Sequence, residues 1–176
     1  MSETRTDDLL LQHIRRFARY NRWANTRLYD ACAKLSPEEY YAARPSFFGS
    51  IHATLNHILV ADTIWFCRFT GKPTSHIKAL NQILHEDFAG LRAARAAKDE
   101  EIIAFCDGID AAALQSTFTY TNFSGQTFSD PLLPPLMHAF NHQTHHRGQA
   151  HGLLSHAGMD PPPLDLIHFI RETGLS

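Results

Sequence analysis

The chain has 176 residues, which fits one domain over residues 1–176 with a sizeable apolar core. Sixteen Lys and Arg against 18 Asp and Glu give a formal net charge of −2 without any dense basic run, which argues against nucleic-acid binding. No apolar stretch approaches the roughly 20 residues of a membrane span, and the polar residues 1–8 lack a signal-peptide core, so we expect a cytoplasmic protein without membrane partners.

Apolar periodicity predicts two long helices in the first half of the chain. Over residues 7–34, apolar or small residues recur at spacings of three and four, as on one face of a helix. Ser36 and Pro37 are typical of a helix start and predict a new short helix, which Pro45 should stop. Residues 50–70 are apolar on nearly every side, as in a helix buried among several neighbours.

The middle of the chain predicts one more long helix and a hairpin. Residues 84–106 are rich in Ala, Glu, Arg and Leu, and Gly108 should close this third helix. The preceding residues 74–83 are expected to form a loop or a short helix. Residues 117–128 alternate Thr, Tyr and Phe around Gly125, which predicts a small β-hairpin on an otherwise helical fold.

The last long helix should follow the hairpin at once. Asp130-Pro131 and the later Pro134 are typical of helix starts, and the helix is expected to run to about His156. The tail, residues 161–176, has one more apolar turn, which could cover a pocket mouth or a dimer contact. Four long helices predict an all-α fold, an up-and-down or crossover four-helix bundle.

The three cysteines point away from both disulfides and a thiolate metal site. Cys32, Cys67 and Cys106 are odd in number, far apart in sequence and never spaced as C-x-x-C. We therefore expect buried, reduced thiols, in keeping with a cytoplasmic location.

Histidine is the unusual residue of this sequence. The chain has 12, and six of them fall between His138 and His156. Positions four apart on a helix differ by only about 40°, so His138, His142 and His146 form one axial stripe. Two imidazoles at this spacing can bind one metal ion, but the spacing leaves two candidate pairs, and the stripe could also be a polar seam without metal.

A metal ion needs a further ligand, which bundles usually supply from a facing helix. His52 and His57 are the candidates, and on a helical wheel they lie about 140° apart, so only one of them can face the ion. Because their helix is apolar all round, periodicity does not choose between them. Five other histidines are expected to be ordinary surface residues without a ligand role: His13, His76, His85, His151 and His168.

Three segments together resemble the DinB family of bacterial proteins, which is also grouped with YfiT-like metal-dependent hydrolases. Residues 141–149, NHQTHHRGQ, look like the family's fourth-helix motif of two ligand histidines followed by Arg-Gly-Gln. Residues 55–59, LNHIL, with the later Asp62 and Trp65, look like its second-helix motif, in which the histidine is the third ligand. Residues 20–25, YNRWAN, also match, so the resemblance covers most of the chain.

The resemblance implies a four-helix bundle, commonly a homodimer, in which His57, His142 and His146 hold a divalent transition metal, zinc or nickel above all. His138 and His145 are then not ligands; one of them should help to line the pocket, and His145 is expected to face away.

The same resemblance allows two roles for Asp62. It could orient an imidazole by accepting its free N–H, or it could pair with an arginine such as Arg22 or Arg147. It is also the only near candidate for a general base.

Three imidazoles leave a divalent ion at least one open position, which is typical of catalytic sites. The resemblance therefore favours a metal-dependent enzyme, either a hydrolase or a thiol-dependent transferase, whose partner is a small molecule such as a low-molecular-weight thiol. The alternative is a non-catalytic metal-binding or stress-response protein.

Overall fold

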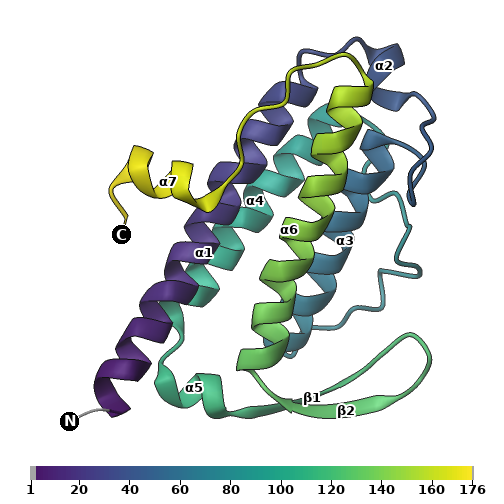
Figure 1. Cartoon of the computed structure of the whole chain (residues 1–176). Coiled ribbons are helices and arrows are strands. Elements are labelled where there is room, and N and C mark those ends of the chain that lie inside the picture. Colours follow the sequence, from purple (N-terminus) through teal and green to yellow (C-terminus); the bar gives the residue numbers. More distant parts are fainter. Residues whose placement is uncertain (1–2, 176) are drawn as a thin grey trace.

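Four long helices lie side by side within residues 3–175, the part of the chain that the computed structural model describes (Figure 1). The first two residues and the last lie outside this range, so the predictions for residues 1–8 and for residue 176 are only partly covered. The described elements are α1 (Glu3–Cys32), α2 (Pro37–Tyr41), α3 (Ile51–Phe69), α4 (Phe88–Gly108), α5 (Ala111–Gln115), β1 (Thr117–Thr121), β2 (Thr127–Pro131), α6 (Leu133–His156) and α7 (Leu166–Thr173).

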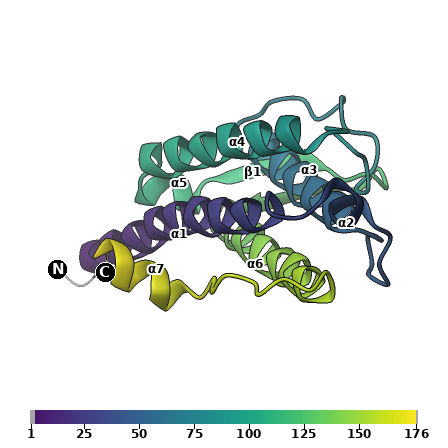
Figure 2. The ribbon, with the colours of Figure 1, turned by 90° about the horizontal axis from the view of Figure 1, so that it is seen from above.

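The order of the helices around the bundle differs from their order in the chain. Helix α1 packs against α4 and α6, and α3 packs against the same two helices, so α1 and α3 lie across the bundle from each other (Figure 2). Helices α3 and α4 run in the same direction, and residues 70–87 return along the length of the bundle to join them (Figure 1). The predicted all-α bundle is confirmed, and its topology is the crossover type.

Side-chain caps explain where α2 and α3 begin. The Ser36 hydroxyl accepts a hydrogen bond from the Glu39 N–H at 3.2 Å, and the Ser50 hydroxyl accepts one from the Ala53 N–H at 3.0 Å. The prediction that Pro45 stops the short helix was wrong. Helix α2 ends four residues earlier, because the backbone at Ala42 leaves the helical region.

Two boundaries in the second half also differ from the predictions. Helix α4 begins at Phe88 instead of 84, since Asp87 is its cap and accepts from the Gly90 N–H at 2.7 Å. Asp130 and Pro131 belong to β2 instead of starting a helix, because Pro131 pairs with Thr117 at the open end of the hairpin. Helix α6 then begins at Leu133, with proline in its first turn.

The interior of the described chain has two large apolar clusters with a polar layer between them, and two smaller clusters beside them. One cluster gathers residues such as Ile14, Phe66 and Ile102, and the other gathers residues such as Leu55 and Leu154. Along every long helix, buried polar side chains occupy the positions between the two clusters. This polar layer consists of Asn21, Asn25, Asp62, Arg95, Asp99, Gln143 and Arg147.

The cysteines are free thiols, as predicted, although only Cys32 and Cys106 are buried and Cys67 is partly exposed. Within residues 3–175, none of the helices combines the length and the apolar character that crossing a membrane requires.

Candidate metal centre

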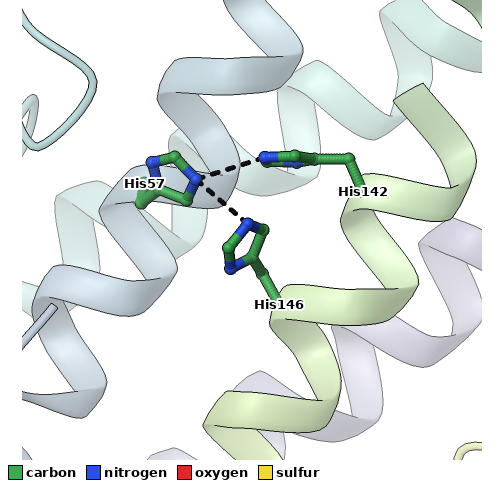
Figure 3. A group of neighbouring side chains, drawn as sticks. All are labelled: His57, His142 and His146. Carbon is green, nitrogen blue, oxygen red and sulfur yellow. Dashed lines mark hydrogen bonds between the residues drawn. The ribbon is translucent and has the colours of Figure 1, made fainter. Parts of the chain in front are cut away.

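Three histidine rings from two neighbouring helices converge on one point (Figure 3). The Nε2 atom of His57, on α3, lies 3.2 Å from Nε2 of His142 and 3.3 Å from Nε2 of His146, both on α6. One ligand atom from each residue lies within 4.8 Å of the others, and no other trio of His, Cys, Asp or Glu in the described chain meets this condition. The structure thus brings together the three residues that the resemblance implied.

The local fold explains why these rings meet. His142 and His146 are four residues apart on α6 and therefore project from the same face, one turn above the other. Helix α6 packs along α3, and His57 lies on the side of α3 that faces this stripe.

The second ring nitrogens determine which atoms are free to bind a cation. The Nδ1 atom of His57 lies 2.8 Å from the Leu80 carbonyl oxygen, and Nδ1 of His146 lies 2.8 Å from the Gln149 side-chain oxygen. Both partners accept hydrogen bonds, so each Nδ1 must carry the proton. The Nε2 atoms of His57 and His146 consequently present lone pairs to each other at 3.3 Å.

Two facing lone pairs repel unless a cation lies between them, so the arrangement fits a metal ion better than the imidazoles alone. Two nitrogens that bind one ion at about 2.1 Å with tetrahedral geometry are about 3.4 Å apart. The separations of 3.2 and 3.3 Å are close to this value. Nδ1 of His142 is buried without a hydrogen-bond partner in the described structure.

The electrostatics of the group keep the rings neutral. Burial lowers the pKa of His57 and that of His146. Burial, followed by the repulsion of His146 and His57, lowers the pKa of His142 to about 3. Neutral imidazole is the form that binds metal, so the lowered pKa values favour the binding state of the site.

The histidines open onto a cavity of about 770 Å³, a volume typical of small-molecule sites. Phe48 covers one face of His57, with the ring centroids 4.0 Å apart and the planes at 22°. Phe47, Leu80 and Gln149 continue the wall. The rings of His57 and His146 are themselves part of the lining.

Of the two α3 histidines, only His57 reaches the site. His52 points to the other side of α3, where its Nδ1 lies 3.0 Å from the Tyr40 hydroxyl and its Nε2 lies 3.2 Å from the Asn56 amide nitrogen. The five histidines expected to have no ligand role are all absent from the converging group.

His138 and His145 lie opposite to the expectation, because His145 lines the cavity and His138 does not. His138 packs edge-on against Trp65, with ring centroids 5.2 Å apart, and does not line the cavity. His145 was expected to face away but lies on the cavity wall. Its Nε2 lies 3.2 Å from the amide nitrogen of Gln149, one turn further along, and this contact holds the ring on the cavity side.

Asp62 pairs with an arginine, which was one of the two roles expected for it, but the partner is Arg95 instead of Arg22 or Arg147. Its carboxylate accepts hydrogen bonds from Arg95 and, at 2.7 Å, from the Gln143 amide, so it orients no imidazole. Arg22 pairs instead with Glu100 at the surface, and Arg147 donates to Asn21. Asp62 is buried in the polar layer and does not line the cavity, which removes it as a candidate base.

The tail does not cover this pocket. The Tyr20 hydroxyl donates to the Leu164 carbonyl at 2.7 Å, and Phe169 packs against Tyr20 on α1. Figure 1 shows α7 beside α1, and none of residues 161–175 lines the cavity.

Sequence reasoning missed two parts of the site. Nothing in the sequence pattern pointed to the Leu80 carbonyl or to Phe48, because both lie in loops. Gln149 was visible as part of the helical stripe, although its contact with His146 could not be inferred.

Comparison with known proteins finds a family model and a relative that match most of the chain. The family model described as "DinB family" matches residues 1–174. The chain is similar to a protein of Bacillus subtilis (strain 168) named "Protein DinB", with 29% identity over 161 residues. The match covers 88% of this chain and 92% of that relative.

Proposed function

The chain belongs to the DinB family, and from this premise we propose that it binds a divalent transition-metal ion, zinc or nickel, through His57, His142 and His146. What supports the proposal above all is the convergence of three Nε2 atoms, two of which have their lone pairs directed inward by bonds at the opposite nitrogen. The site has the ligand type and the ligand number of catalytic metal centres.

We propose further that the protein is an enzyme acting on a small molecule, as a hydrolase or as a thiol-dependent transferase. A divalent ion bound by three imidazoles supplies Lewis acidity that polarises a carbonyl or stabilises a thiolate. The cavity beside the ligands supports this proposal over a non-catalytic metal-binding or stress-response role, since a purely structural metal site needs no adjoining space for a substrate.

The chain's own residues have definite tasks in such a reaction. Leu80 and Gln149 hold the protons on the outer nitrogens of His57 and His146, and so keep both rings in the tautomer that binds the ion. Phe48 shields one face of His57 from water.

Metal analysis of the protein purified without a histidine tag tests the proposal. We expect about one equivalent of divalent metal in the wild type, and loss of stoichiometric metal in His57→Ala, His142→Ala and His146→Ala. Far-ultraviolet circular dichroism should show largely unchanged helix content, because the helices bury their own apolar faces.

His138→Ala is the matched control, since this histidine belongs to the same stripe but packs on Trp65. It should retain the metal. Unchanged metal content in the three ligand variants, or loss of metal in His138→Ala alone, would contradict the assignment. The homodimer and the cytoplasmic location stay predictions.

A further inference from the structure

Large apolar side chains are left in solvent at the cavity beside the histidines. Phe47 is 87% exposed and Leu80 is 51% exposed, and both line this cavity. Exposed apolar side chains that gather at a hollow commonly mark a binding site, whereas single ones scattered on a surface carry no such meaning. Phe47 touches Phe48 edge-on, with ring centroids 4.9 Å apart, and leaves its remaining surface uncovered.

The loop that presents the two phenylalanines is held in place. The Arg44 N–H donates to the Gly49 carbonyl at 2.7 Å, and the Gly49 N–H donates to the Ser46 carbonyl at 3.1 Å. Gly49 has φ 80°, a left-handed conformation that glycine adopts without strain. The Arg44 side chain also donates to the Glu39 carbonyl at 2.7 Å. The exposure of Phe47 is therefore a built feature of a folded loop.

The cavity lining carries no Lys, Arg, Asp or Glu. Its polar groups are the amides of Asn81 and Gln149 and the imidazoles, and the remaining lining is Phe, Leu and Ala. A carboxylate or phosphate on the body of a ligand, away from the ion, would find no cationic side chain among these lining residues to pair with. An uncharged flat group needs no such partner and would bury apolar surface against Phe47 and Leu80.

We propose that the substrate is a small uncharged molecule with an aromatic or similarly flat apolar part, which packs on Phe47, Phe48 and Leu80 while a donor group faces the three histidines. This inference rests on the proposed metal site. It excludes from the proposed substrates those thiols and esters that carry several charges away from the group that faces the histidines.

Matched hydroxamates test the inference on the full-length chain loaded with Co²⁺, whose visible spectrum reports ligand binding. Benzohydroxamate and acetohydroxamate share the metal-binding group and differ in the ring. We expect benzohydroxamate to bind about tenfold more tightly to the wild type, because its ring is buried. Phe47→Ala should reduce this ratio to about threefold or less, since an exposed side chain can be removed without unfolding the protein.

Phe123→Ala is the control, because Phe123 is also an exposed phenylalanine, 51% accessible, but lies at the hairpin turn away from the cavity. It should leave the ratio unchanged. A second test concerns the charge of the ligand instead of its ring. 4-Carboxybenzohydroxamate should bind about tenfold more weakly than benzohydroxamate. Asn81→Arg should remove most of this difference, because the arginine can pair with the added carboxylate.

Equal affinity of the two simple hydroxamates for the Co²⁺-loaded wild type would overturn the inference and leave the metal site intact. An equal loss in Phe47→Ala and Phe123→Ala would also overturn it. Failure of the wild type to bind Co²⁺ would overturn the proposed function itself, and the inference with it.

Discussion

At the scale of single residues, the candidate site depends on which nitrogen of each imidazole carries the proton. A histidine in water exchanges its proton between both nitrogens and offers either one to a metal. Here the Leu80 carbonyl and the Gln149 side chain each hold a proton on Nδ1, at 2.8 Å, and so assign Nε2 to the ion. Burial adds a second effect, because it disfavours the charged imidazolium.

The lowered pKa of His142 predicts how the metal-free protein responds to acid. In the unfolded chain this ring takes up a proton near its ordinary pKa of 6.5, whereas in the folded chain it stays neutral down to a pKa of about 3. The unfolded state therefore binds more protons between these values, and stability should fall as the pH falls from 6.5 towards 3. Above pH 6.5 this group should have no effect.

Urea unfolding of the metal-free protein at pH 7 and pH 5 measures this effect. Allowing for the partial exposure of the ring, we expect His142 to account for about 1 kcal/mol of the loss in unfolding free energy. His142→Leu should show a correspondingly smaller loss. Identical pH dependence in wild type and His142→Leu would contradict the expected charge state of this ring.

At the scale of elements, the crossover segment of residues 70–87 is part of the site. Because α3 and α4 are parallel, this segment must run back along the bundle, and it does so against α3. Ile77 packs against Val60 and Ile64. The Asn56 side-chain oxygen accepts from the N–H groups of Leu84 and His85 at 2.8 and 3.1 Å. The Leu80 carbonyl between these anchors is thereby held at His57.

Asn56→Leu should release the crossover segment from α3. Two partly buried N–H groups would lose their acceptor, at a cost of about 0.5–1.5 kcal/mol each. We expect faster hydrogen exchange over residues 74–87 and about tenfold weaker metal binding, because His57 would lose the partner that orients it. Calorimetric titration with Zn²⁺ measures the second effect.

Gln82→Ala offers the comparison within the same segment. The Gln82 side chain accepts from the Lys78 N–H at 2.7 Å, a contact inside the segment that does not involve α3. This variant should keep the affinity of the wild type for Zn²⁺. Equal weakening in both variants would mean that Asn56 has no special part in positioning His57.

At the scale of the whole molecule, the polar layer keeps the four long helices in register. Asp62 on α3 binds Arg95 on α4 and Gln143 on α6, and Asn25 on α1 donates to Asp99 at 2.9 Å. Apolar contacts alone allow helices to slide, since one leucine fits a neighbouring gap much as another does. Directional bonds in the middle of the bundle fix the level at which α3 and α6 meet, and hence the level at which the histidines converge.

Asp62→Leu should be strongly destabilising. It would leave Arg95 buried with only part of its countercharge, for which we expect a loss of about 3–5 kcal/mol in urea unfolding. Arg22→Ala, which breaks an exposed pair with Glu100, should cost at most about 0.5 kcal/mol. Equal losses for Asp62→Leu and Arg22→Ala would contradict this role.

Local patterns of the sequence were enough for the helices and for the histidine stripe. Repetition every three to four residues, the serine cap at Ser36, and the spacing of His142 and His146 depend only on neighbours in the chain, so they could be predicted directly. The hairpin around Gly125 was predicted for the same reason, and the resemblance to a family supplied His57 where periodicity left two choices.

Only the tertiary structure decided which side chains meet across helices. It paired Asp62 with Arg95 instead of Arg22 or Arg147, turned His145 into the cavity, placed the tail on α1, and brought Leu80 and Phe48 to His57. Each of these contacts joins residues that lie in separate elements or loops of the chain. Their meeting depends on the crossover topology and on the relative level of the helices, and no spacing within one segment of sequence contains that information.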